Sequence, residues 1–363
     1  MNTLQSIEPA YGQALAPELL YLDNGQPVTR PEQWPARRAE LARHLLPLAY
    51  GPLPPAPLHT GCELLHRARV ARLGGAELLT CRVHGGWAHP FTLRVFLPAG
   101  LAGVPVVING DGCWHYASDE VIAAILGRGM AFAQFNRVEI AADLPAGQAP
   151  DSTEDSRPPE PGPAALAAWA WGFHRAIDAL LQVRGAEGAS VDRERIAVVG
   201  HSRGGKAALL AGATDERISL TSANNSGTGG AGSFRQQDAG AETLAELCHA
   251  FPHWCAPGLA RFAGQEADLP FDQHFLKALI APRALLTTEA LADVWANPGG
   301  SWRTHLAAQA AYRLLGVPEH IAMSCRAGTH AHTPADWLRL LDFAAWLFRG
   351  GPRPDTLLSF PPG

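Results

Sequence analysis

The segment from Ile196 to Leu209 constrains the fold more than any other part of this 363-residue chain. Its first four residues are apolar and mostly β-branched, which predicts a short buried strand. Ser202 follows between Gly200 and Gly204, and an alanine-rich helical pattern begins directly after it. A serine hydroxyl is a poor nucleophile unless a tight turn lifts it toward a histidine that can take its proton. We therefore predict that Ser202 is a catalytic nucleophile on a strand-to-helix turn.

The pattern of apolar residues changes along the chain. Residues 63–72, 77–84 and 91–98 predict strands, the last with clear alternation, and together they suggest an antiparallel edge. From residue 104 the strands become continuous apolar runs, as in 105–109 and 130–135, separated by helical patterns. Such runs are typical of parallel strands covered on both faces. We predict an α/β-hydrolase fold, in which a doubly wound, mostly parallel sheet carries helices on both faces as a three-layer αβα sandwich.

The domain organisation follows from the distribution of proline. Residues 1–60 are rich in proline and predict an N-terminal arm packed on the core, and residues 61–363 predict one catalytic domain. Residues 145–163 carry Pro, Gly, Asp and Ser with few apolar positions and predict an exposed loop beside the site. Residues 164–183 predict one long helix that leads into the nucleophile strand.

Composition excludes several classes of function. The chain is 47% hydrophobic and 17% charged, and no apolar run approaches the ~20 residues that span a bilayer. A net charge of −5 argues against nucleic-acid binding. The six cysteines lack C-x-x-C spacing, so we expect neither zinc nor a redox pair, and no cofactor. The first residues carry no secretory signal pattern, which predicts a cytoplasmic protein, or an exported one if the sequence is a trimmed mature form. The oligomeric state stays open.

The acid of a catalytic triad is sought after the serine, because this fold orders its triad as serine, acid, histidine. Residues 281–288 predict a late strand, and the loop after it offers Glu289 and Asp293. Asp293 is the favoured acid and Glu289 the alternative.

Two histidines compete for the role of base, just before the last helical pattern. A base must reach the serine oxygen while its other nitrogen is held by the acid, so only one imidazole can serve. We favour His330 over His332, although their spacing alone does not decide between them. Two histidines one residue apart also suit a metal, but no further His, Cys or Asp cluster nearby completes a shell, so we predict no metal.

With these residues in place, the chain resembles the glucuronoyl esterases of carbohydrate esterase family 15. These serine hydrolases cleave esters between glucuronoyl groups on xylan and lignin alcohols. The resemblance runs over about residues 105–348. It rests on the strings AAWAWG (167–172), GHSRGGK (200–206), NNSG (224–227), FPHW (251–254) and LPFDQH (269–274).

The resemblance implies roles for several further residues. Arg203 would help to stabilise the oxyanion, and Lys206 would contact sugar hydroxyls. Two cations in the first turn of a helix oppose its dipole, which favours a polar or anionic ligand beside them. Glu242, Trp254 and Trp295 match family positions that line the sugar pocket, where a carboxylate accepts hydroxyl protons and an aromatic face stacks on the ring.

One departure from the family concerns Asn225, which stands where some members have a glutamate acid. An amide cannot stabilise an imidazolium by charge, so this departure strengthens Asp293 as the acid. The expected function is a serine esterase acting on small-molecule or oligosaccharide esters of glucuronic or 4-O-methylglucuronic acid. The alternatives are an esterase for acetyl or other acyl groups on sugars, and a non-catalytic carbohydrate-binding homologue. If the protein is cytoplasmic, smaller uronate esters are the expected substrates.

Overall fold

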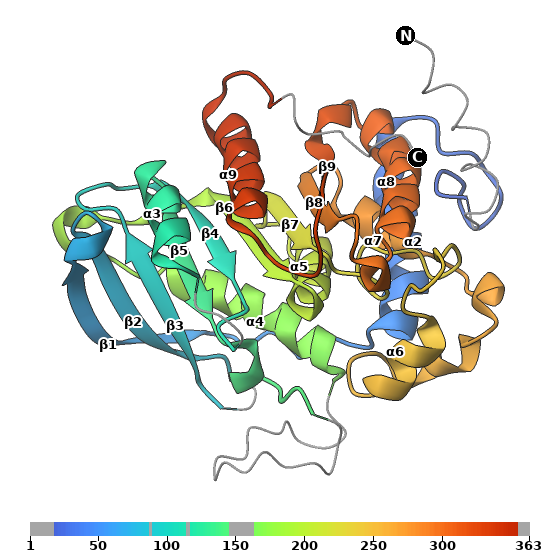
Figure 1. The fold of residues 1–363 in the computed structure, drawn as a ribbon, viewed down its shortest axis with the longest axis horizontal. Coiled ribbons are helices and arrows are strands. Elements are labelled where there is room, and N and C mark those ends of the chain that lie inside the picture. The colour runs from blue at the N-terminus through green and yellow to red at the C-terminus, as the bar shows by residue number, and fades with distance from the viewer. Residues whose placement is uncertain (1–17, 87–88, 114–116, 145–162, 355–363) are drawn as a thin grey trace.

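The computed structural model describes residues 18–86, 89–113, 117–144 and 163–354, and nine strands within them form one sheet (Figure 1). The strand order is β1-β2-β3-β5-β4-β6-β7-β8-β9. The strands are β1 Gly61–Val70, β2 Ala76–His84, β3 Phe91–Leu97, β4 Val104–Asn109, β5 Ala131–Phe135, β6 Val191–His201, β7 Leu220–Asn224, β8 Ala284–Ala290 and β9 Ile321–Arg326.

The sheet has an antiparallel edge and a parallel main part. β1 pairs with β2, β2 with β3 and β3 with β5 in antiparallel register, whereas every pair from β5 through β4 to β9 is parallel. The predicted α/β-hydrolase class with a mostly parallel sheet is confirmed.

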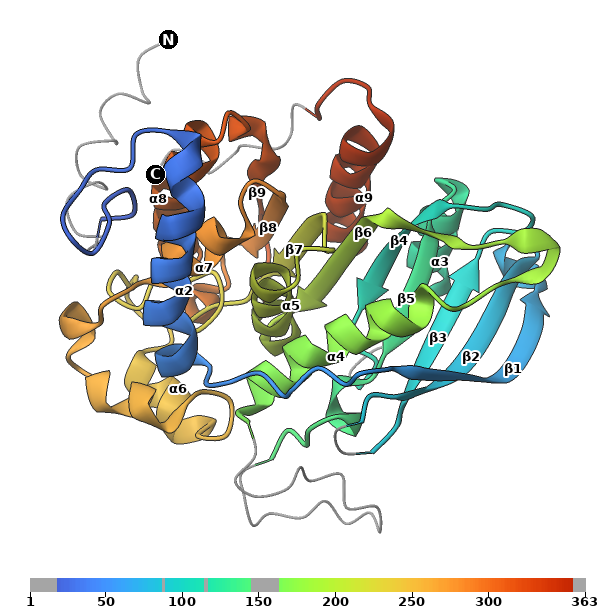
Figure 2. The same ribbon diagram turned by 180° about the vertical axis from the view of Figure 1, so that it is seen from behind.

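Helices cover both faces of the sheet. α3 and α9 lie on one face (Figure 1), and α4 and α5 cover the other (Figure 2). α7 packs beside α5, and both α2 and α8 pack against α7. The helices of these layers, together with the short α6, are α2 Trp34–Ala49, α3 Asp119–Gly127, α4 Ala165–Leu180, α5 Arg203–Thr214, α6 Leu244–Ala250, α7 Gln273–Ile280, α8 Pro298–Leu314 and α9 Pro334–Arg349.

The continuous apolar strands explain this sandwich. In β4, Ile108 joins the core under α4 and α5, whereas its neighbour Val107 joins the core under α3 and α9. In β6, Val198 and Val199 divide in the same way. Successive side chains of a strand point to opposite faces, so a strand that is apolar at every position needs a helix layer on each side.

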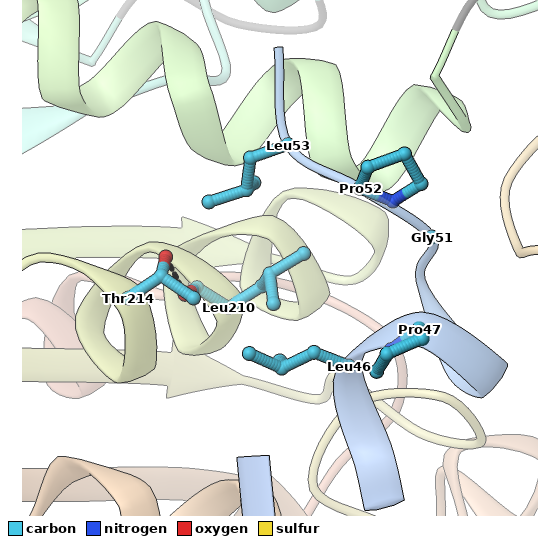
Figure 3. Close-up of a pocket in the computed structure, with 7 residues that line it drawn as sticks. All are labelled: Leu46, Pro47, Gly51, Pro52, Leu53, Leu210 and Thr214. Carbon is cyan, nitrogen blue, oxygen red and sulfur yellow. Dashed lines mark hydrogen bonds between the residues drawn. The ribbon is translucent and has the colours of Figure 1, made fainter. Parts of the chain in front are cut away.

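The segment that precedes the sheet packs on the α4 and α5 layer. Leu46 at the end of α2 and Leu53 beyond it face Leu210 of α5 around an apolar pocket of about 280 Å³ (Figure 3). The Tyr50 hydroxyl donates a hydrogen bond to the carbonyl of Gly229 at 2.9 Å. The division into an arm and one catalytic domain stays a prediction. Residues 1–17 of the arm, and residues 145–162 of the predicted loop, lie outside the described residues.

Candidate active site

Ser202 occupies the sharp turn between β6 and α5. Its backbone has φ 54° and ψ −121°, a combination that a non-glycine residue adopts only where its surroundings hold it in place. The two flanking glycines make the turn possible. A Cβ at Gly200 would lie 2.1 Å from the Gly204 carbonyl oxygen, and a Cβ at Gly204 would lie 1.9 Å from an Asp111 carboxylate oxygen. Only glycine fits at these two positions, so the two glycines allow the sharp turn that carries Ser202.

His330 and Asp293 meet beside this turn. Asp293 follows β8 and His330 follows β9, and Nδ1 of His330 lies 2.5 Å from Oδ2 of Asp293. The Asp293 side chain is only 5% exposed, whereas that of His330 is 42% exposed. His330 and Ser202 line the same pocket. The structure thus brings the three predicted triad residues to the carboxyl edge of the parallel strands, where α/β enzymes bind their ligands.

Neither of the two alternatives takes part in this pair: His332 is half-buried and Glu289 is buried. His332 stacks on Trp337, with ring centres 4.6 Å apart and planes inclined by 18°. Burial lowers the pKa of His332 to about 3. Glu289 is fully buried at the end of β8, and burial raises its pKa to about 8. The hydrogen-bonded pair of imidazole and carboxylate is therefore His330 with Asp293.

Asn225 fixes the loop that carries His330. Its φ of 43° is in the left-handed region, which asparagine tolerates better than most residues. Oδ1 accepts a hydrogen bond from the Ala290 backbone at 2.7 Å, and Nδ2 donates to the Ala331 carbonyl at 3.3 Å. The amide thus joins the end of β8 to the histidine loop, a link that sequence reasoning did not anticipate.

His201 is a second imidazole beside His330, and the sequence analysis gave it no role. Its ring centre lies 4.7 Å from that of His330, and its Nδ1 lies 2.7 Å from Oδ1 of Asn224. Burial lowers the pKa of His201. Its place directly before Ser202 was the only signal in the sequence.

A pocket of about 150 Å³ opens in front of Ser202. Every residue predicted to bind substrate lines this pocket. The lining residues are Ser202, Arg203, Lys206, Asn225, Ser226, Gly227, Glu242, Phe251, Trp254, Trp295, Ala296 and His330.

Lys206 and Glu242 form a buried pair in the floor of this pocket. Nζ of Lys206 lies 3.9 Å from Oε2 of Glu242, and each side chain is 5% exposed. Nζ also donates to the Ser226 carbonyl at 2.6 Å. Burial lowers the pKa of Lys206, and burial raises that of Glu242. A desolvated donor and acceptor placed together suit the hydroxyl groups of a sugar.

The two pocket tryptophans differ in exposure. Trp254 is 3% exposed, and its ring supports the Arg203 guanidinium at 4.7 Å and the Lys206 ammonium at 5.7 Å. Phe251 stacks against it, with ring centres 3.8 Å apart. Trp295 is 50% exposed at the rim and leaves part of its surface open to a ligand. Trp295 is thus better placed to cover a sugar ring, and Trp254 to hold the two cations.

Asp143 is a part of the site that the sequence analysis missed. Its Oδ2 accepts a hydrogen bond from Nη1 of Arg203 at 2.6 Å, and its Oδ1 accepts one from Nε1 of Trp254 at 2.7 Å. Nε2 of His253 lies 3.2 Å from the same Oδ1. Burial alone would raise the pKa of Asp143, but the hydrogen bonds of His253, Arg203 and Trp254 outweigh it and lower the pKa to about 2. Asp143 and Arg203 are 60 residues apart in sequence, so no local pattern linked them.

The described part of the chain contains neither a metal-binding cluster nor a membrane-spanning helix. No group of three or more His, Cys, Asp or Glu side chains within it is placed to hold a metal ion. None of its helices combines the length and apolar character that a membrane crossing requires.

Comparison with known proteins identifies the family. A family model described as "Glucuronyl esterase, fungi" matches residues 82–316, more than half of the chain. The chain belongs to the glucuronoyl esterase family. The resemblance stated from the sequence motifs is confirmed.

Individual glucuronoyl esterases match over most of the chain. The 4-O-methyl-glucuronoyl methylesterase of Hypocrea jecorina is 32% identical over 323 residues, which cover 87% of this chain and 65% of that protein. The structure of the carbohydrate esterase family 15 glucuronoyl esterase of Caldicellulosiruptor kristjansonii has a TM-score of 0.77 at 30% identity, covering 97% of this chain and 96% of that one. A mutant glucuronoyl esterase of Sporotrichum thermophile, solved with methyl 4-O-methyl-β-D-glucopyranuronate, has a TM-score of 0.75 at 27% identity, covering 94% and 89%.

Proposed function

We propose that this protein is a serine esterase that hydrolyses esters of glucuronic or 4-O-methylglucuronic acid. The observation that carries the proposal is the His330 and Asp293 pair, joined at 2.5 Å, with His330 lining the same pocket as Ser202. The relatives named above support the acyl group, because one is a methylesterase of 4-O-methyl-glucuronoyl groups and another was solved with a methyl ester of that sugar acid.

The reaction proceeds through a covalent acyl-enzyme. His330 takes the proton from the Ser202 hydroxyl as its oxygen attacks the ester carbonyl, while Asp293 holds the other imidazole nitrogen and stabilises the imidazolium. His330 then returns the proton to the departing alcohol. A water molecule, activated by the same imidazole, hydrolyses the acyl-enzyme and releases the uronic acid.

Charge that develops on the carbonyl oxygen meets positive groups at the start of α5. The Arg203 guanidinium and the backbone N–H groups of this helix end stabilise an oxyanion, because they are already oriented before the reaction. Lys206 and Glu242 offer a donor and an acceptor to the sugar hydroxyls, and Trp295 offers an aromatic surface.

The direct test is release of methanol from methyl 4-O-methylglucuronate. We expect turnover by the wild-type protein and a loss of at least about 10³-fold in kcat for Ser202→Ala. Ser190→Ala is the matched control and should retain activity, because Ser190 lies directly before the first residue of β6, at the other end of the strand from Ser202. Hydrolysis that persists unchanged in Ser202→Ala would contradict the mechanism.

The acyl preference is tested separately. The competing candidates are an esterase for acetyl groups on sugars and a homologue that binds carbohydrate without turnover. Comparison of kcat/KM for an acetylated xylose and for the uronate methyl ester distinguishes the first, and we expect the uronate ester to be preferred. Binding of the ester with no turnover in protein that retains Ser202 and His330 would favour the second.

A further inference from the structure

The reaction proposed above changes the charge of the ligand. A neutral ester enters the pocket, and an anionic carboxylate remains after hydrolysis. Arg203 and Lys206 both line this pocket, so an unbalanced pair of cations would attract the product more strongly than the substrate. An enzyme with such a pocket would retain its product and slow its own turnover.

Each of the two cations has a carboxylate partner. Asp143 accepts a hydrogen bond from Arg203 at 2.6 Å, and Glu242 lies 3.9 Å from the Lys206 ammonium. The Asp143 carboxylate is 13% exposed and also receives the indole N–H of Trp254, so several contacts fix its position. The four side chains therefore form two pairs of opposite charge beside the pocket.

We propose that Asp143 is a positioning and specificity-determining residue: it orients the Arg203 guanidinium and offsets its charge, so that the pocket binds the neutral uronate ester in preference to the anionic product. This inference rests on the proposed function. It differs from a purely structural role because it concerns the charge of the ligand and not only the shape of the pocket.

Asp143 is proposed both to orient Arg203 and to offset its charge, and the structure allows the effect of the charge to be tested. The Arg203 guanidinium lies over Trp254 at 4.7 Å and over Phe251 at 5.4 Å, so the aromatic rings contact it in addition to Asp143. Removal of the carboxylate charge should leave the cation close to the pocket while the local charge becomes more positive. The low pKa of Asp143, about 2, keeps the carboxylate ionised at every pH at which the enzyme would work.

The test measures binding in a background without turnover. Ser202→Ala and Ser202→Ala with Asp143→Asn are titrated by calorimetry with two ligands, methyl 4-O-methylglucuronate and the free acid 4-O-methylglucuronate. We expect Asp143→Asn to tighten binding of the acid on the order of tenfold, and to change binding of the neutral ester by less than about threefold.

Two further variants sharpen the result. Asp143→Glu retains the charge and should restore the preference for the ester. Asp342→Asn removes a carboxylate that pairs with Arg128 at 3.0 Å in the α3 and α9 layer, and it should change neither affinity.

Equal changes in both affinities, or an unchanged or weakened affinity for the acid, would overturn the inference. The proposed function fails in a different way. If Ser202→Ala binds neither uronate and the wild-type protein does not hydrolyse the ester, the function is wrong, and this inference falls with it.

Discussion

The antiparallel edge and the parallel part of the sheet differ in both packing and function. Every residue of β4 is buried, whereas most of β1 is exposed. The described pocket-lining residues all come from segments that follow the parallel strands, and none comes from β1, β2 or β3. Ser202 follows β6, Asn225 follows β7, and His330 follows β9.

The difference has a simple physical origin. Parallel strands all end at the same edge of the sheet, so loops far apart in sequence meet there, and helices that begin at that edge direct their N-termini toward a ligand. Antiparallel strands alternate in direction, so their loops divide between the two edges. The antiparallel strands β1, β2 and β3 can therefore widen the sheet without contributing to the site. Substitutions beside the parallel strands should lower activity far more than substitutions in these three strands.

The largest difference in kcat is expected between substitutions of two neighbouring histidines. His330→Ala removes the proposed base and should lower kcat by about 10³- to 10⁵-fold, as is typical when a residue of a catalytic triad is lost. His332→Phe keeps a ring stacked on Trp337 and should leave kcat within about threefold. Steady-state hydrolysis of the uronate methyl ester measures both. The reverse order of effects would make His332 the base.

A smaller loss is expected at Asp293, one of two carboxylates near the end of β8. Asp293→Asn leaves the imidazole without a charged partner and should lower kcat by about 10²- to 10⁴-fold. Glu289→Gln is the matched control, because Glu289 is buried away from the pocket surface, and kcat should change less than about threefold. A greater loss in Glu289→Gln would assign the acid to that residue.

Much of this site follows from local sequence, and part of it does not. The two flanking glycines predict the turn at Ser202, and the apolar runs predict the strands. The choice between Glu289 and Asp293 is not local, because both carboxylates are buried near the end of β8 and only the folded chain places Asp293 against His330. Asp143 was missed because its partner Arg203 lies 60 residues away and the two meet only in the folded chain.

Trp254 shows a further limit of sequence reasoning. A tryptophan in a sugar-binding family is expected to stack on a sugar ring. Here the Phe251 ring stacks against Trp254 with ring centres 3.8 Å apart, and Arg203 lies over the indole, so protein side chains contact its aromatic surface. Residue type predicts an aromatic surface, but which neighbours cover it depends on the tertiary fold.

Stability at acid pH offers a third contrast, between His332 beside the parallel strands and the antiparallel strands. Burial lowers the pKa of His332 to about 3 from an ordinary value of 6.5. The folded state therefore binds fewer protons than the unfolded state, so stability is present above pH 6.5 and lost as the pH falls toward 3. Between pH 7 and pH 5 this one histidine should cost about 2 kcal/mol of unfolding free energy.

His332→Phe should remove that part of the loss. Urea unfolding at pH 7 and pH 5 measures it, and the drop in unfolding free energy should be smaller in the variant than in the wild type. His84→Gln is the control from the antiparallel edge, because His84 is exposed, and the pH dependence should stay the same. An unchanged drop in His332→Phe would show that His332 is not the group responsible.

The smallest effect on activity is expected at the rim of the pocket. Trp295→Ala should raise KM for the uronate ester by about three- to tenfold through loss of an aromatic contact, with little change in kcat. Leu64→Ala truncates an exposed leucine of β1, and neither kinetic constant should change. An effect of Leu64→Ala as large as that of Trp295→Ala would remove the functional distinction between the two parts of the sheet.

The most direct test of the whole account is covalent capture with a fluorophosphonate, which reacts only with an activated hydroxyl. We predict one adduct per molecule, on the peptide that contains Ser202, with labelling at least about 10²-fold slower in His330→Ala. Labelling at another residue, no labelling of folded protein, or an equal rate without His330 would contradict the account.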